Sequence, residues 1–144
     1  MKEERTVDIG APPQRVYDLV MNPRRLEDWV TIHHQLEEAP GGQLEQGSHL
    51  TQCLKLAGRK FHVRWQVVEN RPCELVVWEG HGPVASHARV VYRFQPNGGG
   101  TRFTYLNEYE LPGGWLGRLA ERTVSRVTAK EVDATMGKLK SLLE

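Results

Sequence analysis

Tyrosine and asparagine side chains at every second position of one segment could hold an organic ligand and polarise its oxygens. Tyr105, Asn107 and Tyr109 lie in the segment 101–110 and would share one face of a strand, because strand side chains alternate between faces. A tyrosine combines an apolar ring with a polar tip, which suits an aromatic ligand that carries oxygens. A buried amide such as that of Asn107 also needs a hydrogen-bonding partner from protein, water or ligand.

His33 is the one histidine that we expect near the opening of a cavity, because it follows Trp29 closely in the chain. An unperturbed imidazole has a pKa of about 6.5, which suits a general acid or base near neutral pH. A surface histidine on an irregular segment is the competing interpretation, and it is the commoner situation. The weak catalytic candidates are His33, Tyr105, Asn107 and Tyr109.

The histidines do not form a metal-binding motif. His33 and His34 are neighbours, and on a strand they would point to opposite faces. Glu79 and His81 have the spacing to share a face, but no third ligand is indicated, and a catalytic zinc site uses three protein ligands. We therefore expect no metal and no cofactor. The remaining three histidines stand among polar neighbours and are expected to face solvent: His49, His62 and His87.

Covalent catalysis and phosphate binding also lack their usual motifs. The chain contains no Gly-x-Ser-x-Gly sequence of the kind that presents a nucleophilic serine. The glycines at 98–100 lie between two strand-like segments, so they indicate a hairpin turn and not a phosphate-binding helix start. Cys53 lies on a predicted strand without an evident activating base. Both Cys53 and Cys73 are expected to be free thiols, as in most cytosolic proteins.

The charge balance argues against several classes of partner. Lys and Arg number 19 against 18 Asp and Glu, with no block of like charge, so neither a nucleic-acid-binding tail nor a polybasic membrane anchor is predicted. The N-terminus has no apolar run, and no stretch approaches the roughly 20 apolar residues of a transmembrane span. We expect a cytoplasmic protein that forms one domain over residues 1–144, and a homodimer is left open.

The elements that position these residues begin with a short strand and two short helices. Residues 5–9 alternate in polarity, and Gly10 ends that strand. Pro12 and Pro13 suit the first turn of a helix, where an N–H group would have no partner. Asn22 is then expected to cap a second short helix.

The middle of the chain predicts an antiparallel meander of strands. In the segment 60–68, Phe61, Val63 and Trp65 share one face. Tight turns at 57–58 and 96–100 connect neighbouring strands antiparallel, because parallel crossovers need a dozen or more residues. Which face of 74–81 points inward is left open. The predicted strands after the first are 31–38, 48–56, 60–68, 74–79, 86–95 and 101–110.

One long amphipathic helix is predicted over residues 115–143. Together with the sheet it defines an α+β fold of about six or seven strands wrapped toward a C-terminal helix. Trp115, near the helix start, could contact a partner or cap a cavity, and the sequence does not separate the two. The predicted apolar stripe of the helix consists of Leu116, Leu119, Ala120, Thr123, Val127, Met136, Leu139 and Leu143.

Three stretches resemble the START-related (SRPBCC) polyketide cyclase/dehydrase superfamily. VDIGAPPQRVYDLVMNPRRLEDWV resembles its opening strand and paired helices, VVENRPCELVVW its middle hairpin, and FQPNGGGTRFTYLNEYEL its late hairpin. The resemblance covers nearly the whole chain and implies the helix-grip fold, a curved antiparallel sheet around a long C-terminal helix. Ala11 stands where a capping Ser, Thr or Asp would suit the first helix better.

The resemblance implies a cavity for a hydrophobic, ring-containing small molecule of the polyketide, lipid or quinone class. A polyketide cyclase/dehydrase-type enzyme that acts in the same cavity is the alternative, and a subunit that delivers ligand to a complex is a third. We expect a hydrophobic small-molecule partner and no nucleic acid. The candidate ligand-binding residues are Trp29, Phe61, Val63, Trp65, Tyr92, Phe103, Tyr105, Asn107, Leu116, Leu119, Ala120 and Thr123.

Overall fold

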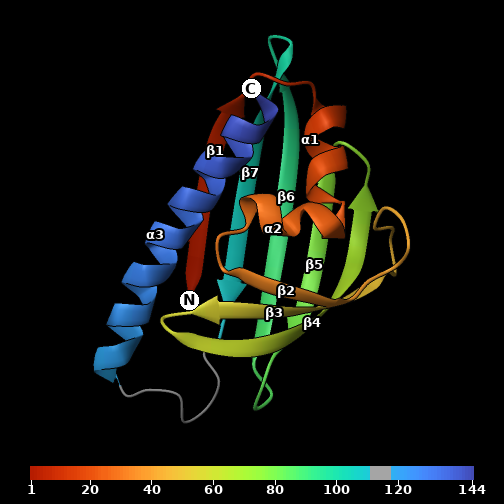
Figure 1. Ribbon diagram of the computed structural model, residues 1–144. Coiled ribbons are helices and arrows are strands. Elements are labelled where there is room, and N and C mark those ends of the chain that lie inside the picture. Colours follow the sequence, from red (N-terminus) through yellow and green to blue (C-terminus); the bar gives the residue numbers. More distant parts are fainter. Residues whose placement is uncertain (111–117) are drawn as a thin grey trace.

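The computed structural model of the chain describes residues 1–110 and 118–144, and for residues 118–121 it describes the backbone alone. Its centre is a seven-stranded sheet with the order β1-β7-β6-β5-β4-β3-β2, in which every neighbouring pair is antiparallel. Figure 1 shows β2, β3 and β4 curving across the lower end of the sheet, so that its inner face is concave. The strands are β1 (Lys2–Ile9), β2 (His33–Glu38), β3 (His49–Leu56), β4 (Arg59–Arg71), β5 (Leu75–His81), β6 (His87–Asn97) and β7 (Gly100–Tyr109).

The helices all lie over this inner face (Figure 1). They are α1 (Pro13–Val20), the 3-10 turn η1 (Pro23–Arg25), α2 (Leu26–Trp29) and α3 (Arg118–Leu143). The arrangement is the helix-grip fold that the order of elements predicted.

Backbone chemistry accounts for the connections. Ala57 and Gly58 have φ values of 50° and 79°, and Gly98 and Gly99 have 57° and 86°, the positive values that two-residue hairpin turns require. At the first helix, Pro12 occupies the cap position without a side-chain hydrogen bond. This matches the absence of a capping side chain at Ala11 in the sequence.

The second short helix begins as the sequence predicts. The Asn22 side chain accepts a hydrogen bond of 3.1 Å from the backbone N–H of Arg24, which satisfies one of the otherwise unpaired donors at a helix start. The following turn places Leu26 and Trp29 in the core, with exposures of 1% and 0%. The core at this point is aromatic, with the Tyr92 ring 6.0 Å from that of Trp29 and 5.6 Å from that of Phe103.

The inward face of α3 differs from the predicted stripe. Thr123 is exposed and Val127 is half-buried, whereas Val124 and Thr128 are buried. The predicted stripe was wrong at Thr123, because the inward face of the helix passes through Val124 and the polar residue Thr128, one position further along the chain. The Thr128 hydroxyl donates to the Val124 carbonyl at 2.8 Å, so the helix itself satisfies this polar group.

The remaining predicted stripe residues divide into two groups. Met136, Leu139 and Leu143 are buried, as expected. Trp115 and Leu116 lie outside the described residues, and the side chains of Leu119 and Ala120 are also outside them. No helix in the described part of the chain is long and apolar enough to cross a membrane.

Candidate functional site

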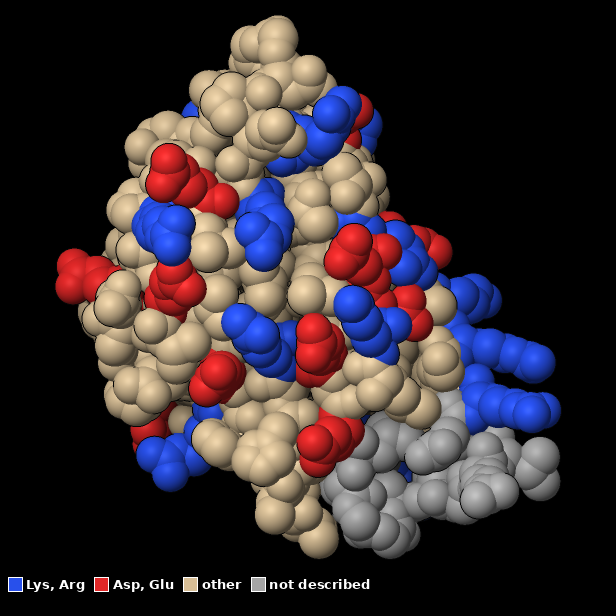
Figure 2. Space-filling view, turned by 180° about the vertical axis from the view of Figure 1, so that it is seen from behind, with Lys and Arg blue, Asp and Glu red and all other residues tan. Residues whose placement is uncertain are grey.

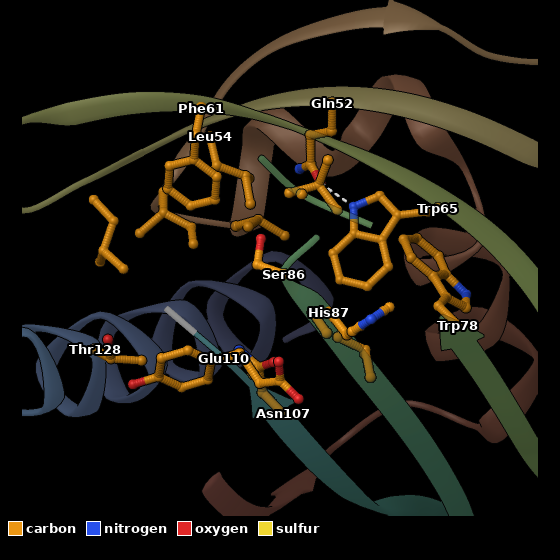
Figure 3. A pocket seen from close by; sticks show the side chains of 18 of the residues that line it. Gln52, Leu54, Phe61, Trp65, Trp78, Ser86, His87, Asn107, Glu110 and Thr128 are labelled. Atoms are coloured by element: carbon orange, nitrogen blue, oxygen red, sulfur yellow. Dashed lines mark hydrogen bonds between the residues drawn. The ribbon is translucent and has the colours of Figure 1, made fainter. Parts of the chain in front are cut away.

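The inner face of the sheet and the helices line a partly open cavity of about 110 Å³. Figure 3 shows Phe61 and Trp65 on one side of it, with Asn107, Glu110 and Thr128 on the other. The volume is somewhat below the roughly 150 Å³ of an engineered apolar cavity that binds benzene. The lining residues are Leu26, Val30, Ile32, Gln52, Leu54, Leu56, Phe61, Val63, Trp65, Trp78, Gly82, Ser86, His87, Ala88, Val90, Tyr92, Tyr105, Asn107, Tyr109, Glu110 and Thr128.

The structure brings many of the sequence-predicted site residues to this wall. Trp29 and Phe103 are fully buried in the adjoining core and do not line the cavity. Thr123 is exposed on α3, where Thr128 takes the inward position. The predicted residues that do line the cavity are Phe61, Val63, Trp65, Tyr92, Tyr105, Asn107 and Tyr109.

A glycine in strand β5 leaves space for the large side chain of Trp65 in the cavity wall. Gly80 is paired with Trp65 across β4 and β5. A methyl group added at Gly80 would lie 2.7 Å from Cε3 of Trp65 and 2.8 Å from Cγ1 of Val63, closer than such atoms approach. The indole of Trp65 therefore lies against β5 only because residue 80 has no side chain. Trp78 also lines the cavity, which settles the open question of the inward face of β5.

A hydrogen-bonded chain runs from this wall to His33. Nε1 of Trp65 donates to Oε1 of Gln52 at 3.0 Å, and Nε2 of Gln52 lies 2.8 Å from Nδ1 of His33. The indole N–H can only donate, so the amide oxygen must face Trp65 and the amide nitrogen must face His33. Nδ1 of His33 is then the acceptor, and the imidazole is neutral with its proton on Nε2. Figure 3 shows the bond between Trp65 and Gln52 at the edge of the cavity.

The electrostatic surroundings favour the same form of His33. Burial lowers the pKa of His33, with a smaller contribution from His34 in the same direction and an opposing one from Glu27. A protonated ring would place an N–H against the Gln52 amide N–H groups. His33 is absent from the cavity lining, so the structure makes it a positioning residue behind Gln52 and gives it no contact with the cavity.

The tyrosines on the inner wall are hydrogen-bond donors at neutral pH. Burial raises the pKa of Tyr92 well above its usual value, and it also raises the pKa of Tyr105. Burial likewise raises the pKa of Tyr109, while the neighbouring Thr128 hydroxyl opposes this rise. Thr128 nevertheless donates to Val124, and the buried Tyr109 hydroxyl has no hydrogen bond of standard geometry within the described residues. It is therefore available to a bound ligand or water.

Several residues that line the cavity were not predicted from the sequence. Gln52 is a polar side chain on the same strand face as Leu50 and Leu54, and it is buried with 4% exposure; its place among these apolar residues could have marked it. His87 was expected to face solvent, and it is indeed exposed, but it also lines the cavity at the start of β6. Ser86 and Glu110 lie at the same end, where they come from a turn and a strand end that periodicity does not place.

The described residues hold no group of three or more His, Cys, Asp or Glu side chains arranged for a metal ion. Cys53 is buried and Cys73 is half-buried, and both are free thiols. Burial raises the pKa of Cys73, which disfavours the reactive thiolate.

The curved sheet, its long helix and the cavity between them define a helix-grip protein. Residues 2–144 match the family described as "Polyketide cyclase / dehydrase and lipid transport". The chain therefore belongs to this family, as its sequence resemblance indicated.

The chain is also similar to a curated protein and to several solved structures. A Mycobacterium tuberculosis protein named "Uncharacterized protein Rv1546" is 27% identical over 125 residues, which are 84% of this chain and 86% of the relative. The structure of TTHA0849 from Thermus thermophilus has a TM-score of 0.79 at 19% identity, covering 98% of this chain and 95% of that one. The ZhuI aromatase/cyclase from Streptomyces sp. R1128 has a TM-score of 0.77 at 15% identity, covering 99% and 93%. At these identities the two structures show the shared fold.

Proposed function

We propose that this protein binds a hydrophobic, ring-containing small molecule in the cavity between the sheet and the helices. The observation that carries the proposal is the cavity itself, with aromatic walls at Phe61, Trp65 and Tyr92. Family membership supports the same class of function. Removing an aromatic ring from water contributes roughly 25 cal/mol per Å² of apolar surface, so an apolar wall is sufficient to drive such binding.

The volume of the cavity limits the size of the ligand that this conformation can bind. A cavity of about 110 Å³ suits roughly one aromatic ring. A molecule with more rings, such as the probe used below, must extend out of the partly open cavity or displace wall side chains, because protein interiors are close-packed. The polar groups restrict the chemistry further, since Trp65 is already bonded to Gln52 and the Tyr109 hydroxyl has no partner among the described residues. A ligand oxygen is thus expected near Tyr109.

The test uses N-phenylnaphthylamine, a neutral aromatic probe whose fluorescence rises in apolar surroundings. We expect saturable binding to the wild-type protein and loss of about tenfold or more in affinity for Ala88→Phe, which places a ring in the cavity. Ala134→Phe, on the exposed side of α3, is the matched control and should bind normally. Absence of saturable binding by the wild-type protein, or equal binding by Ala88→Phe, would contradict the proposal.

Aldol-type cyclisation is the second candidate function, and the convergence of Tyr105, Asn107 and Tyr109 on one wall favours it. Such a ring closure needs a base to remove a proton beside a carbonyl and donors to stabilise the enolate oxygen. The raised pKa values of Tyr105 and Tyr109 make them donors and exclude them as bases at neutral pH. His87 and Glu110, which line the same end, are the groups we propose for the proton removal.

This second candidate is separated from simple binding by comparing turnover with affinity. With a linear poly-β-ketone as substrate, Tyr105→Phe should lower turnover by about tenfold to a hundredfold while probe affinity stays within a factor of about three. His87→Gln should lower turnover in the same way. If neither variant changes the rate of ring closure relative to the reaction without protein, these roles are wrong.

A further inference from the structure

A second hollow adjoins the cavity on the outer side of the sheet, and its polar lining is entirely basic. This hollow, which we call the basic hollow, is lined by Lys60, Phe61, His62, Arg64, His81, Gly82 and Pro83. Phe61 and Gly82 line both the basic hollow and the cavity. An elongated ligand that extends past Phe61 and Gly82 would therefore contact both the cavity and the basic hollow.

Alternation along β4 produces this arrangement. Phe61 and Val63 face the cavity, whereas Lys60, His62 and Arg64 face outward and are exposed. The register then places His81 of β5 directly opposite Arg64, so the basic side chains of the two strands are neighbours.

No nearby carboxylate in the described part of the chain neutralises the two permanent cations of the basic hollow, Lys60 and Arg64. Residues 46–68 contain four Lys or Arg residues and no Asp or Glu. Within the described residues neither Lys60 nor Arg64 forms an ion pair, while His62 is bonded to Glu37. Glu79 is the next carboxylate along β5, and its register partners are Gln66 and Arg89. Figure 2 shows a mixture of both signs over much of this outer surface, in contrast to the one sign lining the hollow.

We infer that the ligand is an acidic amphiphile, with its apolar part in the cavity and its carboxylate or phosphate group in the basic hollow between Lys60, Arg64 and His81. This inference rests on the proposed function and specifies the chemistry of its ligand. A guanidinium and an ammonium at the edge of an apolar cavity stabilise an anionic group through charge-assisted hydrogen bonds. An acid group left outside the cavity also keeps its charge in contact with water, which avoids the cost of burying it.

The test compares two probes that differ in one acid group. Anilinonaphthalene sulfonate carries a sulfonate, and N-phenylnaphthylamine has the same ring system without it. For the wild-type protein we expect the sulfonate to bind more tightly than the neutral probe, and we expect added salt to weaken only the sulfonate. The variant Lys60→Gln/Arg64→Gln should weaken the sulfonate by about tenfold and leave the neutral probe unchanged.

The matched control removes two positive charges elsewhere. Arg93→Gln/Lys138→Gln changes exposed residues of β6 and α3 that do not line either hollow, and it should leave both probes unaffected. If the neutral probe binds and the sulfonate shows no dependence on Lys60 and Arg64, the inference is overturned while the proposed function stands. If neither probe binds, the proposed function itself fails and the inference with it.

Binding to a membrane surface is the alternative role for the basic residues of this hollow, and the variant Lys60→Gln/Arg64→Gln also tests it. The inference predicts that Lys60→Gln/Arg64→Gln changes binding of the soluble sulfonate in the absence of lipid. Co-sedimentation with phosphatidylglycerol vesicles that depends on Lys60 and Arg64, together with unchanged binding of the soluble probe, would identify a lipid surface as the partner and overturn the inference.

Discussion

At the scale of single residues, the shape of the cavity depends on a missing side chain. Gly80 allows the Trp65 indole to lie against β5, with the nearest indole carbon 2.7 Å from the position of an added Cβ. The indole is then held by its bond to Gln52. A small residue and a buried amide together orient the largest side chain of the wall, and neither is recognisable as a functional residue from its type.

Gly80→Ala is therefore expected to lower the free energy of unfolding by about 1–3 kcal/mol, because the indole or the strand must move. Urea denaturation measures this change. Gly137→Ala is the control, since no atom lies within 4 Å of its added Cβ and alanine favours a helix by roughly 0.5–1 kcal/mol over glycine. Equal effects of the two substitutions would show that Trp65 does not press on residue 80.

The neutral state of His33 leads to a prediction about pH. Its pKa is lowered in the folded protein, so the unfolded chain binds more protons as the pH falls through about 6.5. His33 thus contributes stability at higher pH that is lost on acidification. His33→Asn can still accept the hydrogen bond from Gln52 but cannot titrate, and it should lose less stability than wild type between about pH 7.5 and 5.5.

Chemical denaturation at the two pH values provides the measurement for this prediction. The control is His49→Asn, because His49 is exposed on β3 and makes no hydrogen bond with its side chain among the described residues. It should keep the wild-type pH dependence. If His33→Asn also keeps the full wild-type loss, the Gln52 contact does not hold His33 neutral.

At the scale of elements, the β3–β4 hairpin carries both the cavity wall and the basic hollow. Its turn contains Ala57 at φ 50°, a value that asparagine and glycine adopt more readily than alanine. The adjacent Gly58 at φ 79° already suits the turn. The hairpin therefore forms with one favourable residue and one unfavourable residue in its turn.

Ala57→Asn is expected to stabilise the protein by about 0.5–1 kcal/mol, because it relieves the backbone at the turn without touching the core. The midpoint of urea denaturation should rise. Gly58→Ala tests the same turn in the opposite direction and should lower the midpoint by a similar amount or more. A fall in the midpoint for Ala57→Asn would show that this backbone conformation is not the one that limits stability.

At the scale of the whole molecule, ligand binding and folding are thermodynamically linked. A guest that binds only the folded protein raises the free energy of unfolding by about 2.7 kcal/mol at a concentration of 100 times Kd. We expect N-phenylnaphthylamine to raise the melting temperature of the wild-type protein and not that of Ala88→Phe. Differential scanning calorimetry at several probe concentrations measures this, and a melting temperature independent of probe would exclude an interior site.

The sequence by itself determined the architecture and one wall of the cavity. Alternation placed Phe61, Val63 and Trp65 together on a strand, and glycine-rich turns made the sheet antiparallel, because both signals are local and follow from backbone geometry. Only the tertiary structure decided which residues meet across elements. The chain from His33 to Gln52 and Trp65, the inward turn of Thr128 and the basic hollow beside Phe61 depend on sheet curvature and helix rotation, which no single segment encodes.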